Sequence, residues 1–166
     1  MLDIVKIGDE VLREKCTEVT EFDGSLRILL DAMYEALEEA EGVGLAAPQV
    51  GVDKRLFIVS LPDGTKKEFI NPEIIGTSVE TNPYEEGCLS IPGIYHDVIR
   101  PSKVIVKAQD PDGNEFTLKA SGLMARVIQH ENDHLDGVLF IDHLDEAERE
   151  KAMREYGKSK RKRKSY

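Results

Sequence analysis

The sequence contains no Trp and only two cysteines, Cys16 and Cys88, among its 166 residues. Two cysteines are too few for a disulfide framework, so nothing indicates a small secreted scaffold or an oxidising compartment. No apolar run approaches the ~20 residues that are needed to span a bilayer. Charged residues also interrupt residues 1–10, which therefore lack the apolar segment of a secretory signal. We expect a cytoplasmic protein.

Aromatic residues are scarce as well, because the chain has only five Phe and five Tyr. Aliphatic side chains must therefore fill most of the interior. The length suits one domain with a substantial core. Charged residues make up 33% of the chain, which exceeds the ~25% that is usual for a soluble domain.

The net charge of −10 conceals an asymmetry along the chain. Eight of the 22 basic residues and one of the 32 acidic residues lie in 151–166, which leaves 14 basic and 31 acidic residues in 1–150. The acidic body would repel nucleic-acid phosphates, whereas residues 158–164 could contact several of them. The alternative for this segment is a solvated end. We expect a single domain over residues 1–157 and a basic tail over residues 158–166.

Apolar residues at helical spacing predict a helix over residues 25–41, with Ser25 as its N-cap and Gly42 as its stop. Glycines and Pro48 predict a loop or an irregular edge over residues 42–51. Short runs rich in apolar residues predict strands, separated by turns at 62–64 and 71–72, over residues 55–61, 66–70 and 73–80.

The second half of the chain alternates between strand and helix patterns. Residues 104–120 predict a β-hairpin around a turn at 111–114. Residues 121–134 predict a helix that Gly137 can terminate, and residues 145–156 predict a last helix. Short strands clustered between helices indicate an α+β fold, with mostly antiparallel strands around a central metal-binding helix and a C-terminal helix.

Residues 130–134 form an H-E-x-x-H motif within the central helix. Histidines four positions apart lie on one face of a helix, so both rings can bind one metal ion, and Glu131 would be close enough to take a proton from a water at that ion. Leu123, Val127, His130 and His134 follow one another at spacings of 4, 3 and 4. The histidines therefore continue an apolar, inward-facing stripe. The alternative is a pair of hydrogen-bonded core histidines.

A catalytic site of the zinc type has three protein ligands and one open position. Phe140 stands where the long zinc-protease motif has its third histidine, and the glutamates from Glu146 onward lie in a charged stretch that is expected to be exposed. Cys88 is the best remaining candidate, because a thiolate is a strong ligand for Zn²⁺ or Fe²⁺. Its alternative role is that of a small buried hydrophobe. Cys16 is expected to be structural.

Three segments resemble the three motifs of peptide deformylases, in the order of that family. They are GVGLAAPQ at 42–49, EGCLS at 86–90 and QHENDH at 129–134. Together they span most of the chain, and the total length is similar to that of bacterial members. Asn132 departs from the pattern because an apolar residue is commoner there, and Ser121 and Gly122 depart at the start of the helix. None of these three occupies a ligand position.

The resemblance implies a metal-dependent hydrolase that removes the formyl group from the N-terminal formyl-methionine of newly made polypeptides and releases formate. It implies one divalent ion per chain, with Fe²⁺ as the native metal and Zn²⁺, Ni²⁺ or Co²⁺ as alternatives. Glu131 would act as general base and then deliver the proton to the leaving amine. The Gln49 side-chain amide and the Leu89 backbone N–H would stabilise the oxyanion. The metal ligands would be Cys88, His130 and His134.

The resemblance also implies an apolar slot for the methionine side chain and a peptide backbone that lies against the loops as an added strand. Arg100 is expected to pair with Glu86 and orient the second motif, whereas His96 and His143 are expected to be surface or capping residues. The expected substrate-binding residues are Val43, Gly44, Glu86, Gly87, Leu123 and Val127.

The expected partners are N-formylmethionyl nascent peptides and, through the basic tail, the ribosome; no membrane is involved, and a monomer is expected. Two other functions stay open. A metallopeptidase that cuts internal peptide bonds shares the motif, but the sequence offers no convincing third His or Glu ligand. A ribosome-associated binding protein with a structural metal would need four protein ligands, whereas the sequence suggests three.

Overall fold

The computed structural model describes the backbone of residues 2–164 and the side chains of residues 2–158. The architecture is α+β with antiparallel sheets, which confirms the predicted class. Among the described residues, no helix is both long and apolar enough to cross a membrane. Written with η for 3-10 helices, the elements are η1 (Glu10–Arg13), α1 (Gly24–Glu39), β1 (Gly44–Ala46), η2 (Ala47–Val50), β2 (Leu56–Ser60), β3 (Lys66–Thr77), β4 (Thr81–Cys88), β5 (Ile91–Pro101), β6 (Lys103–Gln109), β7 (Glu115–Ser121), α2 (Gly122–Leu135), η3 (Phe140–His143) and α3 (Glu146–Lys164).

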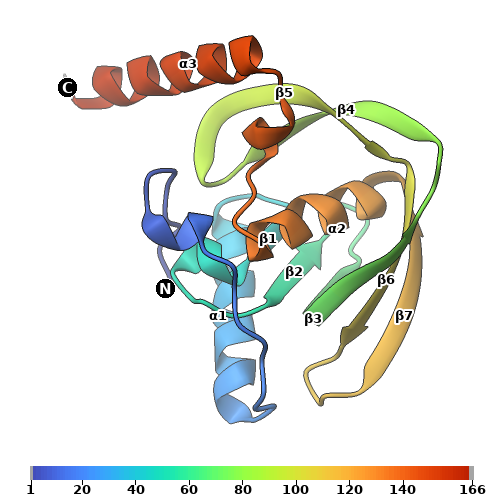
Figure 1. The fold of residues 1–166 in the computed structure, drawn as a ribbon. Helices are drawn as coiled ribbons and strands as arrows, with labels where there is room; N and C mark the ends of the chain where they lie inside the picture. Colours follow the sequence, from blue (N-terminus) through green and yellow to red (C-terminus); the bar gives the residue numbers. More distant parts are fainter. Residues whose placement is uncertain (1, 165–166) are drawn as a thin grey trace.

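The strands form two antiparallel sheets around α2. One sheet has five strands in the order β1-β2-β3-β6-β7, and the other is the β4–β5 hairpin. In Figure 1, α2 lies in the middle of the molecule, with the long hairpin curving over it and α3 on the outside. The helix that carries the H-E-x-x-H motif is therefore the central element, as the sequence predicts.

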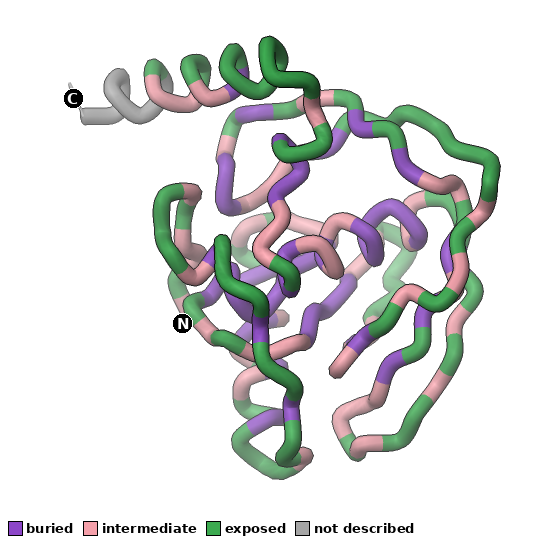
Figure 2. The backbone as a smooth tube through the Cα atoms, in the orientation of Figure 1, coloured by how far each residue is buried: buried purple, intermediate pink, exposed green. Residues whose placement is uncertain are grey.

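The sheet has a helix on each face, and β2 shows this most clearly. Phe57 and Val59 belong to a buried cluster with Val127 of α2, whereas Leu56 and Ile58 belong to a second cluster with residues of α1. Because both faces of β2 are covered, its sequence is a continuous apolar run without the polar alternation of a surface strand. Figure 2 shows the resulting contrast between the largely buried α2 and the mostly exposed α3.

The first helix begins and ends at residues other than those predicted. The Asp23 carboxylate accepts hydrogen bonds from the backbone N–H groups of Ser25 and Leu26, so Asp23 is the N-cap. The helix ends at Glu39, and Glu41 takes a left-handed conformation with φ of 57°. Ser25 and Gly42 are therefore not the cap and the stop.

Tertiary contacts override other sequence expectations. Of the two alternatives for residues 42–51, the irregular edge is right and the loop is wrong, because β1 pairs with β2 at the edge of the sheet and η2 follows it. Residues 71–72 do not form a turn between two strands, because β3 continues through a register shift at Asn71, whose side chain exchanges hydrogen bonds with the backbone of Val19. The hairpin β6–β7 and the helix α2, with Gly137 just after its end, confirm the predictions, while α3 extends beyond 156 to Lys164.

Candidate active site

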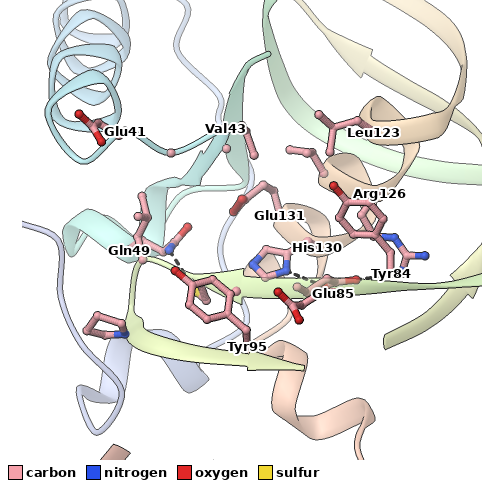
Figure 3. Close-up of a pocket in the computed structure, with 18 of the residues that line it drawn as sticks. Glu41, Val43, Gln49, Tyr84, Glu85, Tyr95, Leu123, Arg126, His130 and Glu131 are labelled. Atoms are coloured by element: carbon pink, nitrogen blue, oxygen red, sulfur yellow. Dashed lines mark hydrogen bonds and ion pairs between the residues drawn. The ribbon is translucent and has the colours of Figure 1, made fainter. Parts of the chain in front are cut away.

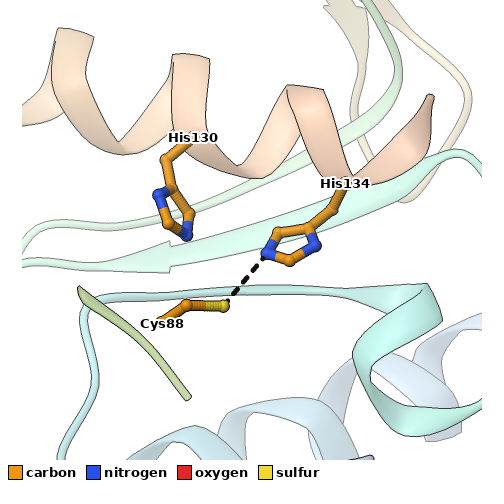
Figure 4. A group of neighbouring side chains, drawn as sticks. All are labelled: Cys88, His130 and His134. Atoms are coloured by element: carbon orange, nitrogen blue, oxygen red, sulfur yellow. Dashed lines mark hydrogen bonds between the residues drawn. The ribbon is translucent and has the colours of Figure 1, made fainter. Parts of the chain in front are cut away.

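The end of β4 and the inward face of α2 bring three metal-binding side chains together, as Figure 4 shows. The ligand atoms of Cys88, His130 and His134 lie within 4.8 Å of one another, and Cys88 Sγ is 3.4 Å from His134 Nε2. Bonds of about 2.0–2.3 Å to a tetrahedral ion place neighbouring ligand atoms roughly 3.4–3.6 Å apart. The thiolate and the two imidazoles therefore fit a divalent ion with three protein ligands.

The second motif fixes the orientation of the first histidine. His130 Nδ1 lies 2.8 Å from Glu86 Oε1. Burial alone would raise the pKa of Glu86, but hydrogen bonds from His130 and Arg100 lower it to about 2, so this carboxylate can only accept. The proton of His130 therefore sits on Nδ1, which leaves Nε2 free to bind a metal.

Two buried arginines neutralise the Glu86 carboxylate. Arg100 donates to both of its oxygens at 2.7 and 3.0 Å, which confirms the predicted pair, and Arg126 donates to Oε2 at 2.9 Å. Arg100 also contacts Asp133 at 2.9 Å, and Asp133 lies 2.8 Å from His143 Nε2. His143 is thus part of a chain of hydrogen bonds that begins at Glu86, a role that the sequence did not indicate.

Glu131 lies beside the two histidines with one oxygen free of hydrogen bonds. Its side chain is buried, Oε1 has no hydrogen-bond partner, and this atom is 3.9 Å from His134 Nε2. Burial raises the pKa of Glu131 to about 7, although the charge of His130 opposes the shift. A group that titrates near neutral pH can take up and return a proton under physiological conditions.

Gln49 approaches the same point from η2. Its Oε1 accepts the backbone N–H of Ala46 at 3.0 Å, so Nε2 must be the atom on the other side of the amide. Nε2 donates to Ser90 Oγ at 3.2 Å and lies 3.6 Å from Cys88 Sγ. The buried amide is thereby held with its donor facing the candidate metal site.

A pocket of about 350 Å³ opens over these groups. Figure 3 shows Gln49, His130 and Glu131 lining it, with Tyr84 and Tyr95 at its sides. Gly44 is required at its wall, because a Cβ there would lie only 2.6 Å from Glu131 Oε2. The sequence-predicted residues that line the pocket are Val43, Gly44, Gln49, Glu86, Gly87, Cys88, Leu89, Leu123, Val127, His130 and Glu131.

The sequence analysis did not identify several residues that support the candidate site. Arg126 is the only charged residue among residues 123–128, which was a usable sign of a buried ion pair. Ser90 lies inside the second motif, but only the structure shows its contact with Gln49. Phe140, considered only as a failed ligand position, stacks on His130 with ring centroids 6.0 Å apart.

Comparisons with known proteins agree on one family. The pattern of the polypeptide deformylase family matches residues 1–150. Peptide deformylase 1 of Clostridium perfringens is 52% identical over 136 residues, which cover 81% of this chain and 92% of that protein. A crystal structure of a peptide deformylase from Legionella pneumophila has a TM-score of 0.94 and 40% identity, and the match covers 100% of this chain and 99% of that one. A peptide deformylase from Synechococcus elongatus in complex with actinonin has a TM-score of 0.90 and 42% identity, over 94% and 88% of the two chains.

Proposed function

The chain belongs to the polypeptide deformylase family and removes the N-formyl group from nascent polypeptides, and we propose that Cys88, His130 and His134 hold the metal ion for this reaction. The observation that carries the assignment is the convergence of all three ligand atoms within 4.8 Å, with Cys88 and His130 lining the pocket. In the described part of the chain this group offers three ligands, which leaves an open position and favours catalysis over a closed structural site.

The surrounding residues supply the proton transfers and the oxyanion contacts. A bound divalent ion would polarise the formyl carbonyl and lower the pKa of a water at the site towards 7. Glu131 takes the proton of the attacking water and returns it to the amine nitrogen as the C–N bond breaks. Gln49 Nε2 and the Leu89 backbone N–H donate to the carbonyl oxygen as negative charge develops on it. The bond between Gln49 and Ala46 supports this, because it aims Nε2 before substrate arrives.

The apolar part of the pocket suits an unbranched thioether side chain. Val43, Leu123 and Val127 form the walls of the methionine slot, and the peptide backbone passes along Gly44 and Gly87. The missing side chains at these two glycines leave room for Glu131 and Tyr95 beside the peptide. Glu86 lines the pocket, but its carboxylate is already engaged by Arg100, Arg126 and His130. Glu86 therefore contributes by holding His130.

We propose Fe²⁺ as the native ion of a cytoplasmic enzyme, since thiolate and imidazole are both suitable ligands for iron. The same ligands would also hold Zn²⁺, Ni²⁺ or Co²⁺. We assign one ion to each chain and take the monomer as the active unit.

The decisive experiment is formate release from formyl-Met-Ala-Ser by anaerobically prepared protein, compared with Glu131→Gln. Loss of a general base should lower kcat at least ~100-fold, while the content of bound metal stays the same. The matched control is Glu85→Gln, because Glu85 is an exposed carboxylate at the pocket mouth. Cleavage of casein without formate release from formyl-Met-Ala-Ser would favour the metallopeptidase instead.

The basic tail, residues 158–166, forms the ribosome-binding part of the protein in this proposal, and residues 1–157 form its catalytic domain. The helix α3 runs through this boundary to Lys164, while the side chains of residues 159–166 lie outside the described part. The six Lys or Arg within residues 158–164 can contact ribosomal RNA phosphates. Deletion of residues 157–166 should weaken binding to ribosomes in a salt-dependent way and leave kcat on short peptides intact, and an unchanged affinity would refute the assignment.

A further inference from the structure

An N-terminal segment, residues 2–8 (the strap), lies next to the candidate active site. It has no regular secondary structure over residues 2–6 and makes a turn at Ile7 and Gly8. The Val5 backbone N–H donates to the carbonyl of Gln49 at 2.8 Å, and the Ile7 backbone N–H donates to the carbonyl of Ser90 at 2.9 Å. These two N–H groups join segments that are 41 residues apart in the sequence.

The strap also joins two separate parts of the core. Leu2 and Ile4 pack against the buried cluster beneath α1, to which Ala47 of η2 belongs. Ile7 packs against another cluster, which contains Ile91 of β5. The strap thus crosses from the five-stranded sheet to the β4–β5 hairpin, and each end is held by its own apolar contacts.

The strap crosses between the two sheets at the point where their relative position sets the distance between Gln49 and Cys88. The Gln49 side chain follows β1 of the first sheet, whereas Cys88 and Ser90 belong to the hairpin. Across this boundary Gln49 Nε2 reaches Ser90 Oγ at 3.2 Å and faces Cys88 Sγ at 3.6 Å. A misplacement of about 1 Å at a reacting centre can cost about 100-fold in rate.

We propose that the strap is a positioning element for catalysis, in which the backbone N–H groups of Val5 and Ile7 set the distance between the Gln49 amide and Cys88. The inference rests on the proposed role of Gln49 as an oxyanion donor. It assigns a function in the reaction to residues that lie outside all three motifs and do not line the pocket.

Proline substitution tests the two N–H groups directly, because proline removes the donor. Val5→Pro and Ile7→Pro are compared with Val5→Ala and Ile7→Ala, which shorten the same side chains and keep the N–H. Asp3→Pro is the control for a proline in the strap, since Asp3 is exposed and its N–H has no hydrogen-bond partner in the described chain. Lys6→Gly, set against Lys6→Ala, loosens the backbone while both donors remain.

The expected result is a fall in kcat of about tenfold or more for each proline variant, with KM within about twofold and bound metal unchanged, because only the transition-state contact is misplaced. Lys6→Gly should lower kcat about two- to threefold by the same reasoning. This variant keeps the test possible even if a proline variant does not fold. In a Gln49→Ala background the proline variants should have little further effect, because both changes act through one amide.

Other outcomes would overturn the inference. Equal losses in the proline and alanine variants would assign the effect to side-chain packing alone. If the fall in kcat of a proline variant multiplied with that of Gln49→Ala, the two changes would act independently and the strap would be a merely structural tether. A lower melting temperature with unchanged kcat per metal-loaded molecule would show the same. Absence of formate release from wild-type protein would refute the proposed function itself, whereas active wild type with unaffected proline variants refutes only the role of the strap.

Discussion

Glu86 accepts a hydrogen bond from His130 Nδ1 at 2.8 Å, so a carboxylate of the hairpin orients an imidazole on α2. Partners of this kind raise ligand basicity, and their loss typically costs 10–100-fold in metal affinity. We therefore expect Glu86→Gln to weaken Zn²⁺ binding by about 10–100-fold in competition with a chelator. Glu86→Asp, which keeps the charge, should lose less.

The control for this substitution is Glu85→Gln, the exposed neighbour on β4. Removal of the Glu86 charge also leaves Arg100 and Arg126 without their buried partner, which costs several kcal/mol of stability. Affinity is therefore measured on protein whose circular dichroism shows a folded chain. Equal affinities for Glu86→Gln and Glu85→Gln would contradict the orienting role.

Leu123 forms one wall of the proposed methionine slot and is only partly buried. Leu123→Ala should lower kcat/KM for formyl-Met-Ala-Ser about tenfold, mainly through KM, because a smaller wall loses apolar contact with the side chain. The same change should reduce the preference for formyl-Met over formyl-Ala substrates. Met124→Ala on the next position of α2, which does not line the pocket, is the matched control. If selectivity for methionine were retained in Leu123→Ala, the slot would have to lie elsewhere.

Asp142 of η3 links the two ends of the chain through Arg13, Arg149 and the backbone N–H of Leu139. Burial alone would raise its pKa, but the hydrogen bonds from Arg13 and Leu139 lower it below the ordinary value of 3.8. Because the pKa of Asp142 is lower in the folded than in the unfolded chain, its charge stabilises the folded state. This stabilisation is fully present above the unfolded pKa of 3.8 and is lost as the pH falls through the folded-state pKa.

Asp142→Asn should therefore reduce the free energy of unfolding by about 1–2 kcal/mol at pH 7. A hydrogen bond to a charged group contributes about 1.5–3 kcal/mol, and water partly screens this pair because both side chains are partly exposed. The difference from wild type should shrink progressively as the pH is lowered below 3.8. Urea unfolding at pH 7 and pH 3 measures both values, with Asp31→Asn as the control, because Asp31 is an exposed residue of α1. A difference that stays the same at the two pH values would exclude the charge as its cause.

Local patterns predicted those parts of the protein that depend on one segment at a time. The 4-3-4 spacing of Leu123, Val127, His130 and His134 placed both histidines on the inward face of a helix, and α2 has this form. The turn at 111–114 predicted the β6–β7 hairpin for the same reason, because its register follows from adjacent residues. The motifs identified Gln49 and the three candidate ligands. The structure brings the ligand atoms within 4.8 Å of one another, and Gln49, Cys88 and His130 line one pocket.

Contacts between distant segments decided the rest. No periodicity in residues 42–46 marks a strand, because β1 exists through pairing with β2, and the long β4–β5 hairpin was missed although it carries Cys88. The sequence alone determined which residues can bind a metal and move a proton. Only the tertiary structure decided that Glu86 holds His130 and that the strap joins Gln49 to Ser90, because hydrogen bonds between groups far apart in the sequence do not depend on local spacing.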